Sequence, residues 1–155
     1  MKRLLGAALS VAAMAATSGC TPEQVAWWAR AGERDRATVT EHVIRSAAEE
    51  FGVNPDFMVV LAQCEGGLVD PLNKNPKSSA KGPFQFLDTT WDGVNGRPGA
   101  KDRLHERGID PAPYTSEDRA NPVAQARIAA NVISEGGLSW WNESRHCWGK
   151  SGSKP

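Results

Sequence analysis

One acidic residue stands where an ordinary surface charge is not expected. Glu65 ends the apolar segment LAQCE and is followed directly by Gly66 and Gly67. The apolar residues before it have the spacing of one helix face, namely Phe57, Val60, Leu61 and Cys64. The two glycines end that helix, so Glu65 is predicted in its last turn, next to the buried stripe. A carboxylate there faces the unfavourable end of the helix dipole, a conflict that is typical of a functional site.

A second segment, GPFQF at residues 82–86, gives this carboxylate a context. Together with the helix that ends at Glu65, it resembles the catalytic core of the lytic transglycosylases of the lysozyme superfamily. In that family a helix ending in Glu-Ser is followed by a polar loop, the sequence Gly-Leu-Met-Gln-Ile and a short helix. The segment 121–133 is similar to the family's helix behind the substrate groove. The resemblance covers roughly residues 40–148 and is clearest over 54–94.

The resemblance implies a role for several residues of the two segments. Glu65 would be the catalytic acid and base, and Gln85 would contact the substrate. Gly82 and Phe84 would form the backbone and the wall of the groove. The chain departs from the family pattern at residue 66, where Gly66 stands in place of the usual serine, and at Pro83, which replaces an apolar residue.

A further departure lies near the C-terminus. Many relatives carry Tyr-Asn-Ala-Gly there, whereas this chain has WWNE at residues 140–143. Trp141 and Asn142 are therefore the candidates for that wall of the groove. Without the resemblance, a tryptophan is more often a core residue, and a glutamate near a helix end is usually a surface charge.

The chemistry gives a reason for a carboxylic acid in apolar surroundings. Cleavage of a glycosidic bond needs a proton for the leaving oxygen, and burial can raise the pKa of a glutamic acid from about 4.3 to about 6. Phe57, Leu61 and either Phe84 or Phe86 are expected to supply this environment. The family uses one carboxylate, because the C6 hydroxyl of the sugar is the attacking group. The expected reaction cleaves the β-1,4 bond of peptidoglycan between N-acetylmuramic acid and N-acetylglucosamine and leaves a 1,6-anhydro end.

Two other functions remain open at this point. The same fold could be a hydrolytic muramidase, in which Asp70 or Asp92 would activate water as the second carboxylate. The domain could instead be a glycan-binding envelope lipoprotein that keeps the groove without turnover.

Composition and motif spacing argue against several other classes of protein. The 18 basic and 18 acidic residues cancel, which disfavours a nucleic acid as the partner. His42, His105 and His146 lack the spacing of a zinc site, and the segment 70–76 lacks the glycine of a calcium loop. We expect neither a metal nor a cofactor.

The N-terminus predicts export. A positive start and an apolar stretch make residues 1–20 a signal peptide that is too short to span a bilayer. Its end, TSGC, resembles the lipobox of bacterial lipoproteins, which makes Cys20 the lipidation site and a membrane the anchoring surface. An ordinary soluble secreted protein is the alternative. The protein is therefore expected in the cell envelope or periplasm.

The cysteine count is connected with this prediction. The chain has three cysteines, an odd number for an exported protein. If Cys20 carries the lipid, Cys64 and Cys147 are left to form a disulfide in an oxidising compartment. The alternative is that Cys64 is a buried thiol.

The remaining pattern predicts one mainly helical, lysozyme-like domain. Residues 21–37 form a tether or an N-terminal helix, residues 38–150 the domain, and residues 151–155 a flexible tail. Caps and apolar periodicity predict helices, or short helices, over 39–51, 54–65, 87–94, 101–107 and 121–135. Residues 68–82 are predicted to form a loop or short hairpin beside the catalytic helix, and residues 110–119 a loop.

Overall fold

The computed structural model describes residues 30–70, 74–152 and 154–155. Of these residues 58% are helical, which confirms the predicted mainly-α class. In chain order, with η for a 3-10 helix, the elements are α2 (Glu33–Glu50), α3 (Pro55–Glu65), α4 (Asp88–Asp92), η1 (Ala100–Asp102), α5 (Arg103–Glu106), η2 (Glu117–Ala120), α6 (Pro122–Ser134), η3 (Gly137–Ser144) and α7 (Arg145–Trp148). Among the described residues, extended pairing is limited to isolated bridges, in which Lys81 pairs with Lys74 and with Phe86.

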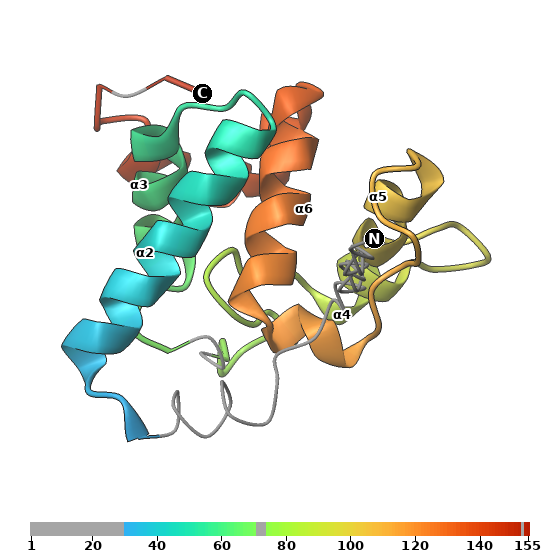
Figure 1. Cartoon of the computed structure of the whole chain (residues 1–155), viewed down its shortest axis with the longest axis horizontal. Helices are drawn as coiled ribbons and strands as arrows, with labels where there is room; N and C mark the ends of the chain where they lie inside the picture. Colours follow the sequence, from blue (N-terminus) through green and yellow to red (C-terminus); the bar gives the residue numbers. More distant parts are fainter. Residues whose placement is uncertain (1–29, 71–73, 153) are drawn as a thin grey trace, which may run out of the picture.

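Three long helices form the framework of the domain. Helix α2 packs against both α3 and α6, and the three lie next to one another in Figure 1. Helix α6 is buried around most of its circumference, because η1, η2, η3 and α5 cover the faces that α2 leaves open. Its small residues Ala124, Ala126, Ala129 and Ala130 are fully buried, and they let neighbouring elements approach its backbone closely. Among the described elements, α6 is thus the one that packs against the most others.

The starts of α3 and α6 follow the same local rule. The Asn54 side chain accepts hydrogen bonds from the backbone of Asp56 and Phe57 at 2.9 and 3.3 Å, and Pro55 occupies the first helical position. The Asn121 side chain accepts from the backbone N–H of Val123 at 2.9 Å, again with a proline following. These caps confirm the predicted beginnings of both helices.

The structure differs from the predicted elements at three places. Helix α2 begins at Glu33 rather than at residue 39. This earlier start was not predicted, because the first turns are mostly exposed and carry no apolar periodicity. The predicted loop over 110–119 contains the start of η2. Elements η3 and α7 were not predicted, since short helical turns give too few residues for a 3.6-residue period to be recognised.

The predictions for the N-terminus fall outside the described residues. The signal peptide at 1–20, Cys20 and most of the predicted tether at 21–37 belong to the part that the structure does not describe. Within the part that it does describe, no helix has the length and the apolar character needed to cross a membrane.

Candidate active site

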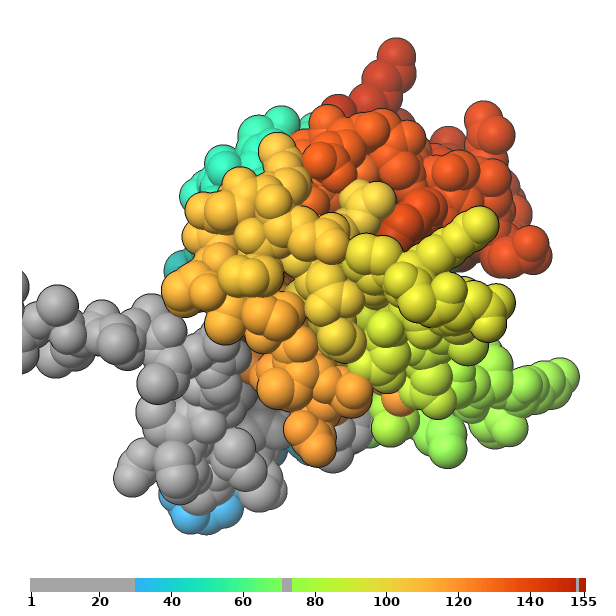
Figure 2. Space-filling model, turned by 90° about the vertical axis from the view of Figure 1, so that its right-hand side faces the viewer, coloured from blue at the N-terminus to red at the C-terminus, as the bar shows by residue number. Residues whose placement is uncertain are grey.

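Glu65 lies in a pocket between the end of α3, the loop 74–87 and η3. The pocket has a volume of about 570 Å³, within the range of sites that hold small ligands. Its lining is Glu65, Asn75, Ala80, Phe84, Gln85, Phe86, Leu87, Thr90, Trp140, Trp141 and Glu143. Figure 2 shows that the segment around residues 80–100 and the segment after residue 137 adjoin on one face of the molecule. The pocket therefore joins parts of the chain that are far apart in the sequence.

The environment of Glu65 favours the protonated acid. Burial raises the pKa of this carboxyl, and the hydrogen bond that the Ser144 hydroxyl donates to Oε1 opposes part of that increase. Phe84 and Phe86 line the pocket, as the sequence predicted for one of them. Phe57 and Leu61 are fully buried in the core and do not line the pocket. Glu65 is thus a partly buried acid with one hydrogen bond that fixes its orientation.

Ser144 was not predicted as a site residue. It is the last residue of η3 and is 8% exposed, and its single hydroxyl proton is shared between Glu65 and the carbonyl oxygen of Trp141, which lies 3.1 Å from Oγ. No local sequence pattern pairs residue 144 with residue 65. A single clue was available, because the predicted disulfide brings the neighbours of Cys64 and Cys147 together.

That disulfide is present in the structure. The sulfur atoms of Cys64 and Cys147 are 1.98 Å apart, and their Cα atoms are 5.9 Å apart, a usual separation for a disulfide. The bond joins the last turn of α3 to α7. Because Glu65 follows one cysteine and Ser144 precedes the other by three residues, the bond keeps the acid close to its hydrogen-bond donor.

The contact between α3 and the GPFQF segment depends on two glycines. A Cβ atom on Gly66 would overlap the carbonyl oxygen of Gly82, and the Gly66 N–H donates to the carbonyl of Pro83 at 3.2 Å. Gly82 has a φ of +75°, a conformation that glycine adopts without strain. The serine that is usual at position 66 in the resembled family would therefore not fit here without a shift of the loop.

The predicted substrate contacts occupy different positions around this loop. Gln85 and Phe84 line the pocket, whereas Gly82 is buried behind it. Gln85 has a φ of +50°, and its Nε2 donates to the carbonyl of Gly82 at 2.9 Å. Trp141 lines the pocket and donates from its Nε1 to the carbonyl of Phe84 at 3.0 Å. The loop and η3 are thus tied together where they form the walls.

The lining of the wall from η3 differs in part from the prediction. Asn142 is exposed and is not among the lining residues, whereas its neighbours Trp141 and Glu143 are. Trp140 also lines the pocket and is 42% exposed, with the guanidinium of Arg103 5.1 Å from its ring centroid. This cation–π contact holds an aromatic ring at the rim.

The carboxylates proposed for a hydrolytic reaction lie elsewhere. Neither Asp70 nor Asp92 lines the pocket, and Asp92 accepts a hydrogen bond from the hydroxyl of Ser116 at 2.6 Å. The second carboxylate in the lining is Glu143, which the sequence did not single out. It follows Asn142 directly, so the turn at 140–143 presents a different side chain than the resemblance implied.

Among the described residues, no group of three or more histidine, cysteine, aspartate or glutamate side chains is placed to hold a metal ion. Comparison of the chain with protein-family models, with curated proteins and with solved structures finds no match.

Proposed function

We propose that this protein is a peptidoglycan lytic transglycosylase. The observation that carries the proposal is the position of Glu65, a partly buried carboxyl with a raised pKa in a pocket with aromatic walls. Aromatic rings suit the apolar faces of sugars, while Gln85, Asn75 and Thr90 offer polar atoms to hydroxyl and N-acetyl groups. The substrate class is a β-1,4-linked glycan of N-acetylmuramic acid and N-acetylglucosamine.

In this reaction Glu65 acts twice. The carboxylic acid gives its proton to the glycosidic oxygen as the bond from that oxygen to C1 of the muramic acid breaks. The resulting carboxylate accepts the proton of the C6 hydroxyl, whose oxygen forms the new bond to C1. The acid is regenerated and no water is consumed. A single partly buried acid is sufficient for these two proton transfers, which is why the position of Glu65 supports the proposed reaction.

Ser144 would fix the orientation of the Glu65 carboxyl. Its hydrogen bond to Oε1 leaves Oε2 as the oxygen that exchanges a proton with the substrate. This hydrogen bond also stabilises the carboxylate after the first proton transfer, because it favours the charged form.

A hydrolytic muramidase is the second candidate, and Glu143 is the observation that favours it. This carboxylate shares the pocket with Glu65 and could activate a water molecule. The role that the sequence assigned to Asp70 or Asp92 would then belong to Glu143.

The test is mass spectrometry of purified peptidoglycan digested by the wild type, by Glu65→Gln and by Glu143→Gln. We expect wild-type products lighter by one water molecule than hydrolysed glycans, and a loss of at least about 100-fold in Glu65→Gln, the usual scale for general acid–base catalysis. Glu143→Gln should still form anhydro ends. Reducing-end products that disappear in Glu143→Gln would instead establish the muramidase.

The absence of any product from folded wild-type protein would remove the enzymatic proposal and favour the non-catalytic glycan-binding protein. Near-ultraviolet circular dichroism of all three proteins supplies the control for folding.

The proposal also includes export and a lipid anchor at Cys20. Its support is the positive, apolar and small-residue pattern of residues 1–20. An intact-mass measurement of the mature protein from the same preparation decides it, since a mature chain that starts at an unmodified residue would exclude the anchor.

A further inference from the structure

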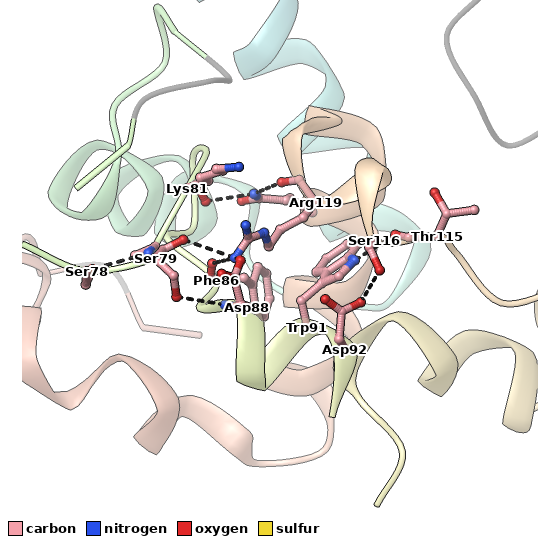
Figure 3. A network of polar contacts seen from close by, with 12 residues as sticks. Ser78, Ser79, Lys81, Phe86, Asp88, Trp91, Asp92, Thr115, Ser116 and Arg119 are labelled. Atoms are coloured by element: carbon pink, nitrogen blue, oxygen red, sulfur yellow. Dashed lines mark hydrogen bonds and ion pairs between the residues drawn. The ribbon is translucent and has the colours of Figure 1, made fainter. Parts of the chain in front are cut away.

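The loop that forms one wall of the pocket is held from behind by two buried polar side chains. Arg119 of η2 is 7% exposed, and Gln125 of α6 is completely buried. Figure 3 shows Arg119 directed toward Ser79, Phe86 and Asp88. Neither Arg119 nor Gln125 lines the pocket. We call this pair of side chains the latch.

Both the oxygen and the nitrogen of the Gln125 amide form hydrogen bonds to this loop and its surroundings. Its Oε1 accepts from the backbone N–H of Phe84 at 2.9 Å. Its Nε2 donates to the carbonyl of Lys81 at 2.8 Å and to the carbonyl of Arg119. An amide that is completely buried and fully hydrogen-bonded fixes the position of its partners, since each lost bond would leave a buried polar group without a partner.

Arg119 holds the two ends of the segment 79–88, which makes up most of this loop. Its Nη1 donates to the carbonyl of Ser79 at 3.0 Å and forms an ion pair with Asp88, whose backbone N–H donates to the Ser79 hydroxyl at 3.0 Å. The segment 79–88 is therefore fixed at its ends by Arg119 and at its middle by Gln125.

The position of the middle of the loop is passed on to Glu65 by direct contact. A Cβ atom on Gly82 would overlap the amide of Gln125, and one on Gly66 would overlap the carbonyl of Gly82. The backbones of the two segments are thus in contact, with Gln125 on the far side. On the other wall, the carbonyl of Phe84 receives the hydrogen bond of Trp141. Without the hydrogen bonds to Gln125, the loop is free to move relative to Gly66 and Trp141, and its distance from Glu65 is no longer fixed.

We propose that Gln125, supported by Arg119, is the positioning residue that sets the distance between the substrate-contacting loop and Glu65. The inference deepens the proposed function and rests on it, because it assigns Gln125 a part in catalysis without contact with the substrate. Its consequence is chemical as well as structural. If the loop moves away from Glu65, water reaches the carboxyl, and its pKa falls toward the ordinary value.

Helix α6 offers a matched control for this inference. Asn131 lies on the same helix and is also completely buried, but its side-chain amide has no hydrogen-bond partner among the described residues. Gln125→Met removes the amide of the latch at a similar volume. Asn131→Met replaces an equally buried amide without touching the loop.

The experiment compares these two variants with the wild type in three measurements. We expect kcat/KM for peptidoglycan cleavage to fall about 10- to 100-fold in Gln125→Met, as for other displacements of about 1 Å in an active site, and to stay within about twofold in Asn131→Met. The upper limit of the pH–rate profile should move to lower pH in Gln125→Met. Amide hydrogen exchange at Phe84 and Gly66 should become faster in Gln125→Met than in Asn131→Met.

Two results separate this inference from the proposed function. If the wild type has no activity, the pKa of Glu65 by carbon-13 NMR and the exchange rates still decide the inference. A Glu65 pKa and exchange rates that are equal in both variants would overturn it. If Gln125→Met does not fold, Arg119→Lys replaces it, because lysine retains the charge toward Asp88 but lacks the guanidinium fork. We expect the same direction of change, and an unaltered Glu65 pKa in that variant would overturn the inference.

Discussion

At the scale of single residues, Glu65 is a side chain whose surroundings work against its charge. It ends a helix, where the dipole disfavours an anion, and it is partly buried. Burial raises its pKa, and within the described chain the hydrogen bond from the Ser144 hydroxyl opposes this shift. Such an arrangement keeps the carboxyl protonated up to a higher pH, at the expense of stability.

That expense is measurable as a pH dependence of unfolding. Between the ordinary pKa of 4.5 and the raised value, the folded protein binds more protons than the unfolded chain. The free energy of unfolding therefore decreases as the pH rises through this window. We expect Glu65→Gln to have a higher Tm than the wild type at pH 7 and an equal Tm well below the ordinary pKa. Calorimetric melting at both pH values checks this.

The matched control is Glu143→Gln, which changes a carboxylate in the same pocket that is exposed. A stability gain that is equal in the two variants, or that persists at acid pH, would contradict the explanation by burial.

The sequence pattern singled out Glu65 as a candidate but not the residues that contact it or hold its pocket, and the reason is physical. Glu65 conflicts with its own helix, so it can be recognised from neighbours within a few residues. Ser144 and Gln125 agree with their local surroundings and act on residues 79 and 41 positions away in the chain. Local pattern carries no information on such pairs. Glu143 lies in a 3-10 turn, where the direction of a side chain does not follow from helical periodicity.

At the scale of elements, helix α2 contains a buried hydroxyl that makes no hydrogen bond to the described residues. Thr40 of α2 is completely buried, and its Oγ1 has no partner among the described residues. Burial of a polar atom without a partner opposes folding.

Thr40→Val should therefore stabilise the protein by about 1 kcal/mol, since valine has the same shape without the polar atom. Chemical denaturation measures the change. Thr38→Val is the control, because the Thr38 hydroxyl is exposed and donates to the carbonyl of Arg34 at 2.9 Å. A Thr40→Val variant that is no more stable than Thr38→Val would mean that a water molecule satisfies the buried hydroxyl.

The long elements were predictable because they combine caps with apolar periodicity. Asn54-Pro55 and Asn121-Pro122 mark helix starts that depend on adjacent residues alone, and α3 and α6 begin where predicted. The beginning of α2 was missed, since exposed turns such as those at Glu33 and Asp35 lack the apolar repeat. Elements η3 and α7 owe their conformation to tertiary contacts, including the burial of Trp141 and Trp148.

At the scale of the whole molecule, the disulfide joins the last turn of α3 to α7 across 83 residues of sequence. Helix α6 lies within this span and packs against α2, which precedes it, while Cys147 is exposed at the surface. Closing so long a loop restricts the unfolded chain. The chain-entropy model gives roughly 4 to 5 kcal/mol as the upper figure for the resulting stabilisation.

Reduction of the bond, or the double variant Cys64→Ala/Cys147→Ala, should lower the Tm by about 10 °C or more. Thermal melting with and without reductant measures this. Cys20→Ser keeps the disulfide and should melt like the wild type, which makes it the control for loss of a cysteine. A wild type whose Tm is indifferent to a reductant that is shown to cleave the bond would contradict the prediction.

The position of η3 and α7 also determines when a growing chain can first acquire the pocket. Trp141, Ser144 and Cys147 are among the last residues of the domain to be synthesised, whereas Glu65 is made much earlier. A nascent chain that has reached the end of α6 possesses the acid and the latch but lacks one wall, the serine and the disulfide partner. An activity that depends on this pocket therefore begins only after η3 and α7 have been synthesised and have packed against the earlier elements.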